Sequence, residues 1–141
     1  MSTFLRQFSE RFCALNKDNL SNLSTLYAKD IQFIDPLHQI NGLDALTAYF
    51  TQLYANVSSI KFEIHACDSV SASEGYLRWT MHFSHPKLRA GRTISVAGCT
   101  HLKWHDTVFY HRDFFDAGAM LYEQLPVFGS IIAWLKRRMA A

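Results

Sequence analysis

Apolar residues recur at helical spacing in the N-terminal part of the chain. Residues 3–15 place Phe and Leu side chains on one side of a helix and charged side chains on the other. The pattern then predicts a second helix ending near Lys29–Asp30, a short strand at 31–34, and a third helix that opens at Asp44. Pro36 ends the strand because proline lacks the amide hydrogen that a sheet requires.

The second half of the chain has the period of extended strands. Alternating apolar and polar residues predict long strands at 59–67, 75–85, 92–104 and 108–116. The last part returns to helix, interrupted at Pro126 and Gly129. Helices followed by antiparallel strands predict an α+β domain, residues 1–141, in which helices cover one face of a curved sheet. Such a sheet leaves a cavity for a small ligand.

Composition and charge narrow the class of protein. The chain has 141 residues, of which 49% are hydrophobic and 18% charged, as in an ordinary domain with one core. The net charge of +2 is concentrated only at Lys136–Arg138, so we expect no nucleic-acid partner. Cys13, Cys67 and Cys99 have no CxxC spacing and are expected to be reduced and mostly buried. No signal peptide is recognisable, so the cytoplasm is the expected location.

Three segments carry a family resemblance. Leu26–His38, Asn41–Leu46 and His111–Asp116 resemble the nuclear-transport-factor-2-like (NTF2-like) superfamily, most closely its SnoaL-like branch. The resemblance covers nearly the whole chain and implies a cone-shaped α+β barrel (cystatin-like fold) with a deep pocket, in a homodimer. The superfamily includes isomerases, cyclases, epoxide hydrolases, dehydratases and non-catalytic binding domains, so it implies the fold more closely than the function.

The resemblance also singles out two acids. Asp35 falls where ketosteroid isomerases carry their catalytic base, and Asp113 matches one catalytic carboxylate of limonene-epoxide hydrolases. The other parts of both sites are replaced: Arg11 stands at the isomerase tyrosine, Gly98 at its second acid, and the apolar segment 79–83 at the hydrolase Arg-x-Asp. A pair of acids, one from each relative, remains.

Strand alternation places His111 on the same face as Asp113, together with Phe109 and Phe115. A carboxyl group in apolar surroundings has a raised pKa, and an Asp-His-Asp cluster with Asp35 can move a proton or activate water. The expected pocket lining is Phe33, His38, Trp79, Met81, Phe83, Val96, Gly98 and Tyr122.

Each acid also has a purely structural explanation. Asp35, before a proline, can simply accept backbone hydrogen bonds in a turn. Asp113 can pair with Arg112 or Arg78, or bond to its neighbouring histidine. Asp116 is expected to cap a short helix rather than to take part in chemistry.

The function remains open between two main classes. As an enzyme, the protein is expected to be an isomerase, a hydratase or dehydratase, or a hydrolase, with Asp35 as base and Asp113 and His111 as the second group. We expect a small apolar ligand and neither cofactor nor metal, because no histidine pair has zinc-site spacing. The alternatives are a non-catalytic module that binds a small ligand or lipid, and a domain that only mediates protein contacts.

The C-terminal helix combines apolar residues with the basic Lys136–Arg138. It either closes the pocket mouth or packs in a dimer interface, with the basic residues favourable at a helix C-terminus. The alternative is a helix lying on a membrane surface, with Trp134 among the headgroups.

Overall fold

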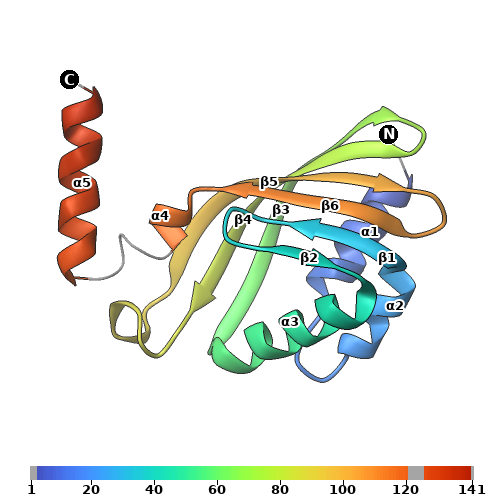
Figure 1. Cartoon of the computed structure of the whole chain (residues 1–141), viewed down its shortest axis with the longest axis horizontal. Helices are drawn as coiled ribbons and strands as arrows, with labels where there is room; N and C mark the ends of the chain where they lie inside the picture. Colours follow the sequence, from blue (N-terminus) through green and yellow to red (C-terminus); the bar gives the residue numbers. More distant parts are fainter. Residues whose placement is uncertain (1–2, 121–125, 141) are drawn as a thin grey trace.

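A computed structural model describes residues 3–120 and 126–140 and shows helices packed against a curved sheet (Figure 1). The first half of the chain contains α1 (Thr3–Cys13), the 3-10 turn η1 (Leu20–Asn22), α2 (Leu23–Leu26), β1 (Tyr27–Ile34), β2 (Gln39–Asn41) and α3 (Leu43–Asn56). The second half contains β3 (Ser59–Ser71), β4 (Glu74–Ser84), the turn η2 (Arg89–Gly91), β5 (Ile94–Trp104), β6 (Val108–Phe115), α4 (Ala117–Met120) and α5 (Pro126–Ala140). The predicted α+β order is confirmed.

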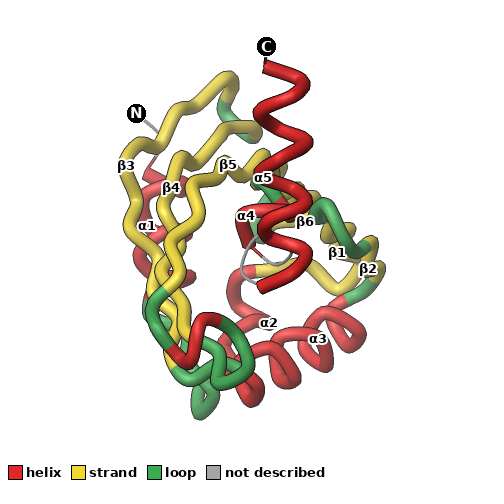
Figure 2. Tube along the Cα trace, turned by 90° about the vertical axis from the view of Figure 1, so that its left-hand side faces the viewer, coloured by secondary structure: helices red, strands yellow, loops and turns green. Residues whose placement is uncertain are grey.

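The six strands form one open sheet in the order β2-β1-β6-β5-β4-β3. Neighbours are antiparallel except β1 and β6, which run parallel. The sheet bends around its inner face, and α1, α2 and α3 close that face (Figure 2). The interior therefore lies between the sheet and these helices.

Strands β4 and β5 bury alternate residues as predicted. On β4 the side chains of Trp79, Met81 and Phe83 are buried, and on β5 those of Ile94 and Val96 are buried. Burial of an apolar side chain of this size contributes roughly 1.5–3 kcal/mol each. These two strands thus form the wall of the core opposite the helices.

The N-terminal half departs from the predicted boundaries. The second helix ends at Leu26, and the strand begins at Tyr27 rather than at residue 31. Tyr27 pairs with Val108 on β6, so pairing between distant segments overrides the local helical pattern. The short strand β2 was not predicted, and the cysteine prediction is wrong for Cys13, which is exposed.

A bulge in β6 makes the predicted inward position of Phe109 wrong. Tyr110 pairs with Lys103 and Val108 with Trp104, which leaves Phe109 as an extra residue. Val108 therefore takes the inward position, and Phe109 stacks on the ring of His105 with 4.7 Å between ring centroids. The alternation that places His111 inward holds only from Tyr110 onward.

The C-terminal segment begins with the predicted cap. The Asp116 carboxylate accepts a hydrogen bond of 2.9 Å from the Gly118 amide, as expected of a residue that opens a helix. Pro126 is the first residue of α5, where proline fits, but Gly129 lies inside that helix instead of interrupting it.

Helix α5 stands off the sheet in Figure 1. Trp134 is 51% exposed, and Ile131, Leu135 and Met139 are also exposed. No described helix is long and apolar enough to cross a membrane. The three hypotheses for α5, that it closes the pocket mouth, packs in a dimer interface or lies on a membrane surface, all stay predictions.

The close contact between Gly98 and Trp79 generates the first prediction. A Cβ atom at position 98 would overlap the Trp79 ring, so Gly98→Ala forces the indole out of place. We expect a loss of about 1–3 kcal/mol in the free energy of unfolding, measured by urea denaturation. Ala97→Ser, at the neighbouring exposed position, is the control and should change stability by less than about 0.5 kcal/mol. Equal stability of the two variants would contradict this packing.

Candidate functional site

A cavity of about 220 Å³ lies between α1, α3 and the inner face of the sheet. An apolar cavity of about 150 Å³ binds benzene, so this one has room for a ring with substituents. Its apolar wall is formed by Phe12, Phe33, Leu37, Tyr49, Phe50, Leu53, Tyr54, Val57, Ile60, Phe62, Trp79, Met81, Phe83, Leu88 and Phe115. The remaining lining residues are Asp35, His38, His85 and Asp113.

Asp113 reaches the cavity from β6 with one oxygen held by two donors. Its Oδ1 accepts a 2.6 Å hydrogen bond from the Thr100 hydroxyl and one of 2.8 Å from Nε2 of His111. The side chain is 18% exposed. Its Oδ2 has no hydrogen-bond donor among the described residues, so this oxygen remains available to a ligand.

His111 is 2% exposed and uses both ring nitrogens. Its Nδ1 lies 2.9 Å from the Tyr27 hydroxyl, which burial and then the Asp113 charge keep protonated by raising the Tyr27 pKa. Tyr27 therefore donates to Nδ1, and the Nε2 hydrogen points at Asp113. Every polar group of this buried pair is satisfied.

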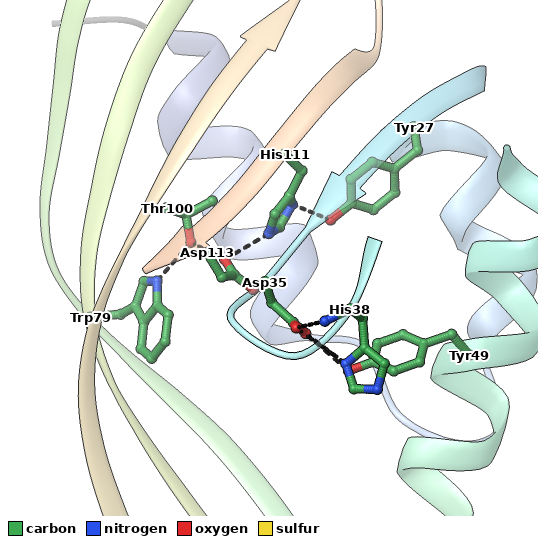
Figure 3. Close-up of polar contacts among 8 residues, drawn as sticks. All are labelled: Tyr27, Asp35, His38, Tyr49, Trp79, Thr100, His111 and Asp113. Carbon is green, nitrogen blue, oxygen red and sulfur yellow. Dashed lines mark hydrogen bonds and ion pairs between the residues drawn. The ribbon is translucent and has the colours of Figure 1, made fainter. Parts of the chain in front are cut away.

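Thr100 links the same carboxylate to the opposite wall. The indole Nε1 of Trp79 can only donate, and it lies 2.7 Å from the Thr100 hydroxyl oxygen. The Thr100 hydrogen is thus directed to Asp113. Figure 3 shows the resulting hydrogen-bond chain from Trp79 through Thr100, Asp113 and His111 to Tyr27.

Asp35 enters the cavity from the end of β1 and is held differently. Its Oδ1 accepts backbone hydrogen bonds from Leu37 at 2.8 Å and His38 at 2.7 Å, as the turn interpretation expects. Its Oδ2 lies 3.2 Å from the donating hydroxyl of Tyr49, and Nδ1 of His38 lies 3.1 Å from Oδ1. The carboxylate is 5% exposed. Asp35 therefore both braces the turn and lines the cavity.

The two acids lie on neighbouring strands. Ile34 pairs with Arg112 in the parallel β1–β6 register, so Asp35 and Asp113 follow at adjacent positions. Neighbouring strands are about 4.8 Å apart. Arg112 does not pair with Asp113 but lies over the Phe114 ring on the outer face, 5.0 Å from its centroid. Among the described residues neither Arg112 nor Arg78 forms an ion pair with Asp113, whereas the hydrogen bond to His111, the other structural explanation, is present.

Most predicted pocket residues reach the cavity, but two do not. Phe33, His38, Trp79, Met81 and Phe83 line it. Val96 and Gly98 are not among the residues that line it. Val96 pairs with Met81, and the Trp79 ring covers Gly98. Tyr122 lies outside the described residues.

Several lining residues were missed in the sequence analysis. Tyr49, Phe50 and Tyr54 were not among the expected lining residues. They form the cavity wall on α3. Their helical spacing was the available signal, because a helix that covers a curved sheet turns its buried face toward the cavity.

A second void of about 20 Å³ lies beside Asp113. Its polar lining residues are Ser9, Thr100, His111 and Asp113. A void of this size has room for one water molecule, which requires two to four polar partners. In the part of the chain that the structure describes, no group of His, Cys, Asp and Glu is arranged to hold a metal ion.

The curved sheet, its helical cover and the cavity define an NTF2-like α+β protein. Solved structures with this fold include a protein of Shewanella putrefaciens CN-32 provisionally named a SnoaL-like polyketide cyclase, at 20% identity and a TM-score of 0.70, covering 85% of this chain and 94% of that one. An LEH-like epoxide hydrolase of Mycobacterium tuberculosis is 15% identical, with a TM-score of 0.71 and coverage of 94% and 97%.

Residues 5–108 match the SnoaL-like domain family, and the chain belongs to that family. The predicted NTF2-like fold and its SnoaL-like branch are therefore confirmed. No curated protein matches the sequence significantly.

The position of Thr100 between two partners generates a stability prediction. Thr100→Val keeps the shape but leaves the Trp79 indole hydrogen without its acceptor, which costs about 1–3 kcal/mol in the free energy of unfolding. The matched control is Thr80→Val, whose hydroxyl bonds the exposed His65. Urea denaturation should show a clear loss for the first variant and a change below about 0.5 kcal/mol for the second. Equal effects would contradict the hydrogen-bond chain.

Tyrosines in the cavity wall make stability sensitive to alkaline pH. Burial, followed by the nearby Cys13, raises the pKa of Tyr54 to about 12, from about 10 in an unfolded chain. The folded state then holds this proton more tightly, so its contribution is complete below about pH 10 and is lost as the pH rises toward 12.

Tyr54→Phe should reduce the alkaline slope of the free energy of unfolding, by at most about 1.4 kcal/mol per pH unit. Denaturant titrations at successive pH values measure this slope. Identical slopes for the wild type and the variant would contradict the raised pKa.

Proposed function

We propose that this protein is a cofactor-free enzyme in which Asp113 transfers a proton to or from a small, mostly apolar molecule held in the cavity. The observation that carries the proposal is the asymmetry of the Asp113 carboxylate. Two donors fix Oδ1, whereas Oδ2 has no donor among the described residues. A general base must be held in position and must keep a lone pair for its substrate.

The other polar groups take supporting roles in this proposal. His111 and Thr100 hold the carboxylate plane, and Tyr27 holds His111. Five hydrogen-bond contacts already engage the two oxygens of Asp35, which makes it a poorer base than Asp113. We therefore give the base role to Asp113, in place of the Asp35 of the sequence-based hypothesis, and assign Asp35 to the electrostatic environment of the substrate.

Three reaction types use such a carboxylate without a cofactor. In an isomerisation, Oδ2 removes a proton from a substrate carbon and returns it to another atom of the same molecule. In a hydrolysis, Oδ2 removes a proton from water while the oxygen of that water attacks a substrate carbon, the C–O bond of that carbon breaks, and the proton passes from Oδ2 to the departing oxygen. In a hydration, the water oxygen adds to one carbon of a double bond and the proton passes from Oδ2 to the other carbon. The void beside Asp113 has room for a water molecule, which supports the reactions that consume water. Two structural neighbours are named as a cyclase and an epoxide hydrolase, and such reactions use acid–base catalysis.

Asp113→Asn tests the proposal directly. The amide keeps the size of the side chain but is not basic, so turnover should fall by about 10²–10⁴-fold while the protein stays folded. The assay is product formation from a panel of ring-bearing epoxides and enolisable ketones, followed by mass spectrometry, and proton exchange with D₂O for the ketones.

The matched control is Asp68→Asn, an exposed acid on β3, which should leave turnover unchanged. Full activity of Asp113→Asn would remove Asp113 from the mechanism. A panel of ligands that bind the cavity but are never converted would favour the second candidate, a non-catalytic binding module. The observation that favours this second candidate is the complete engagement of Asp35 by its turn and by Tyr49.

A further inference from the structure

The cavity has an unbalanced charge. Asp35 and Asp113 both line it, and none of its lining residues in the described part of the chain is Lys or Arg. Nearby basic side chains lie elsewhere: Arg11 is exposed and bonds Thr25, and Arg112 lies over a ring on the outer face. The acidic side chains of the cavity wall are therefore not matched by any described lysine or arginine of that wall.

The rest of the wall strengthens this preference. Nine of the lining residues are Phe, Tyr or Trp. Aromatic ring faces carry a negative quadrupole potential and attract cations within about 6 Å of the ring centroid. Negative charge and aromatic faces therefore act on a ligand in the same direction.

Two of the donors that an anionic ligand requires are already engaged. The Tyr49 hydroxyl donates to Asp35, and the Trp79 indole donates to Thr100. Burial and the Asp35 charge raise the pKa of Tyr49, so this group stays a neutral donor to Asp35. His85 is another donor in the wall, because its Nδ1 accepts from the Lys87 amide and its hydrogen is then on Nε2. A carboxylate or phosphate in the cavity would therefore meet two like charges and this neutral donor.

We propose that the ligand of this cavity is a mostly apolar molecule that carries a positively charged nitrogen, as a protonated or quaternary amine. The apolar part lies between the aromatic rings, and the cationic nitrogen lies near Oδ2 of Asp113. The volume of about 220 Å³ fits one ring with a substituted ammonium group. This inference names the ligand class of the proposed site, and it holds for a binding module as well as for an enzyme.

Three probes of similar size separate the effect of ligand charge on binding from the effect of ligand shape. Benzyltrimethylammonium carries the cation, neopentylbenzene is its neutral isostere, and phenylacetate carries a negative charge. Binding is followed by NMR at about pH 8, with the indole signal of Trp79 as the reporter because this ring lies in the cavity wall. We expect the ammonium ion to bind at least about tenfold more tightly than the isostere and phenylacetate not to bind.

Variants then assign the preference to the two acids. Asp113→Asn and Asp35→Asn should each weaken binding of the ammonium ion several-fold and leave binding of neopentylbenzene unchanged or improved. Asp68→Asn on the outer part of β3 is the control and should bind all three probes like the wild type. The ¹⁵N spectrum of each variant shows whether the fold is kept, and Asp35→Asn serves if Asp113→Asn does not fold.

Three results would overturn the inference. The first is that neopentylbenzene binds as tightly as benzyltrimethylammonium or more tightly. The second is that phenylacetate binds more tightly than benzyltrimethylammonium, and the third is that millimolar benzyltrimethylammonium does not shift the Trp79 signal. The outcome is independent of the turnover test. Selective binding of benzyltrimethylammonium together with a fully active Asp113→Asn variant refutes only the role of Asp113 as the base. An inactive variant without cation selectivity refutes only the ligand class.

Discussion

The parallel pairing of β1 with β6 is the constraint on which the rest of the structure depends. It joins the helical first half of the chain to the four long strands of the second half, and it sets Phe33 beside His111 and Ile34 beside Arg112. The helix α3, which follows β1 and β2, is thereby held over the inner face of the sheet. A shift of one residue in this register would turn one of the two acids away from the cavity.

Burying a polar group costs free energy unless it forms hydrogen bonds. In this core the hydrogen bonds of the chain that links Trp79 to Tyr27 all lead toward Asp113. Trp79 and Tyr27 stand at the two ends of the hydrogen-bond chain as donors, and both sets of bonds lead to one oxygen of Asp113. Each donor in this chain has a single acceptor, so the orientation of the Asp113 carboxylate is fixed before a ligand binds. Such prearranged dipoles need no reorganisation when charge develops on a bound molecule.

The sequence predicts the fold better than it predicts the site. Alternation identified the inward residues of β4 and β5, and the resemblance identified the two acids. Alternation failed at Phe109, because a bulge depends on how two distant strands pair. It also placed Gly98 in the cavity lining, although the Trp79 ring covers that position, so facing inward differs from reaching the cavity.

The parts of the site that were missed share one cause. Tyr27 and Thr100 lie in segments whose patterns predict an ordinary helix and an ordinary strand. Their hydrogen-bond partners, His111 and Trp79, are far away in the sequence. Nothing local marks a residue whose role is to bond a neighbour across the sheet. Pairwise contacts of this kind become visible only when the register of the strands is known.

The contact between Gly98 and the Trp79 ring has a consequence for how the specificity of this protein can change. Position 98 never touches the cavity, yet it sets the depth at which the indole lies and therefore the volume in front of it. A substitution at position 98 can therefore change the volume of the cavity without altering any residue that lines it.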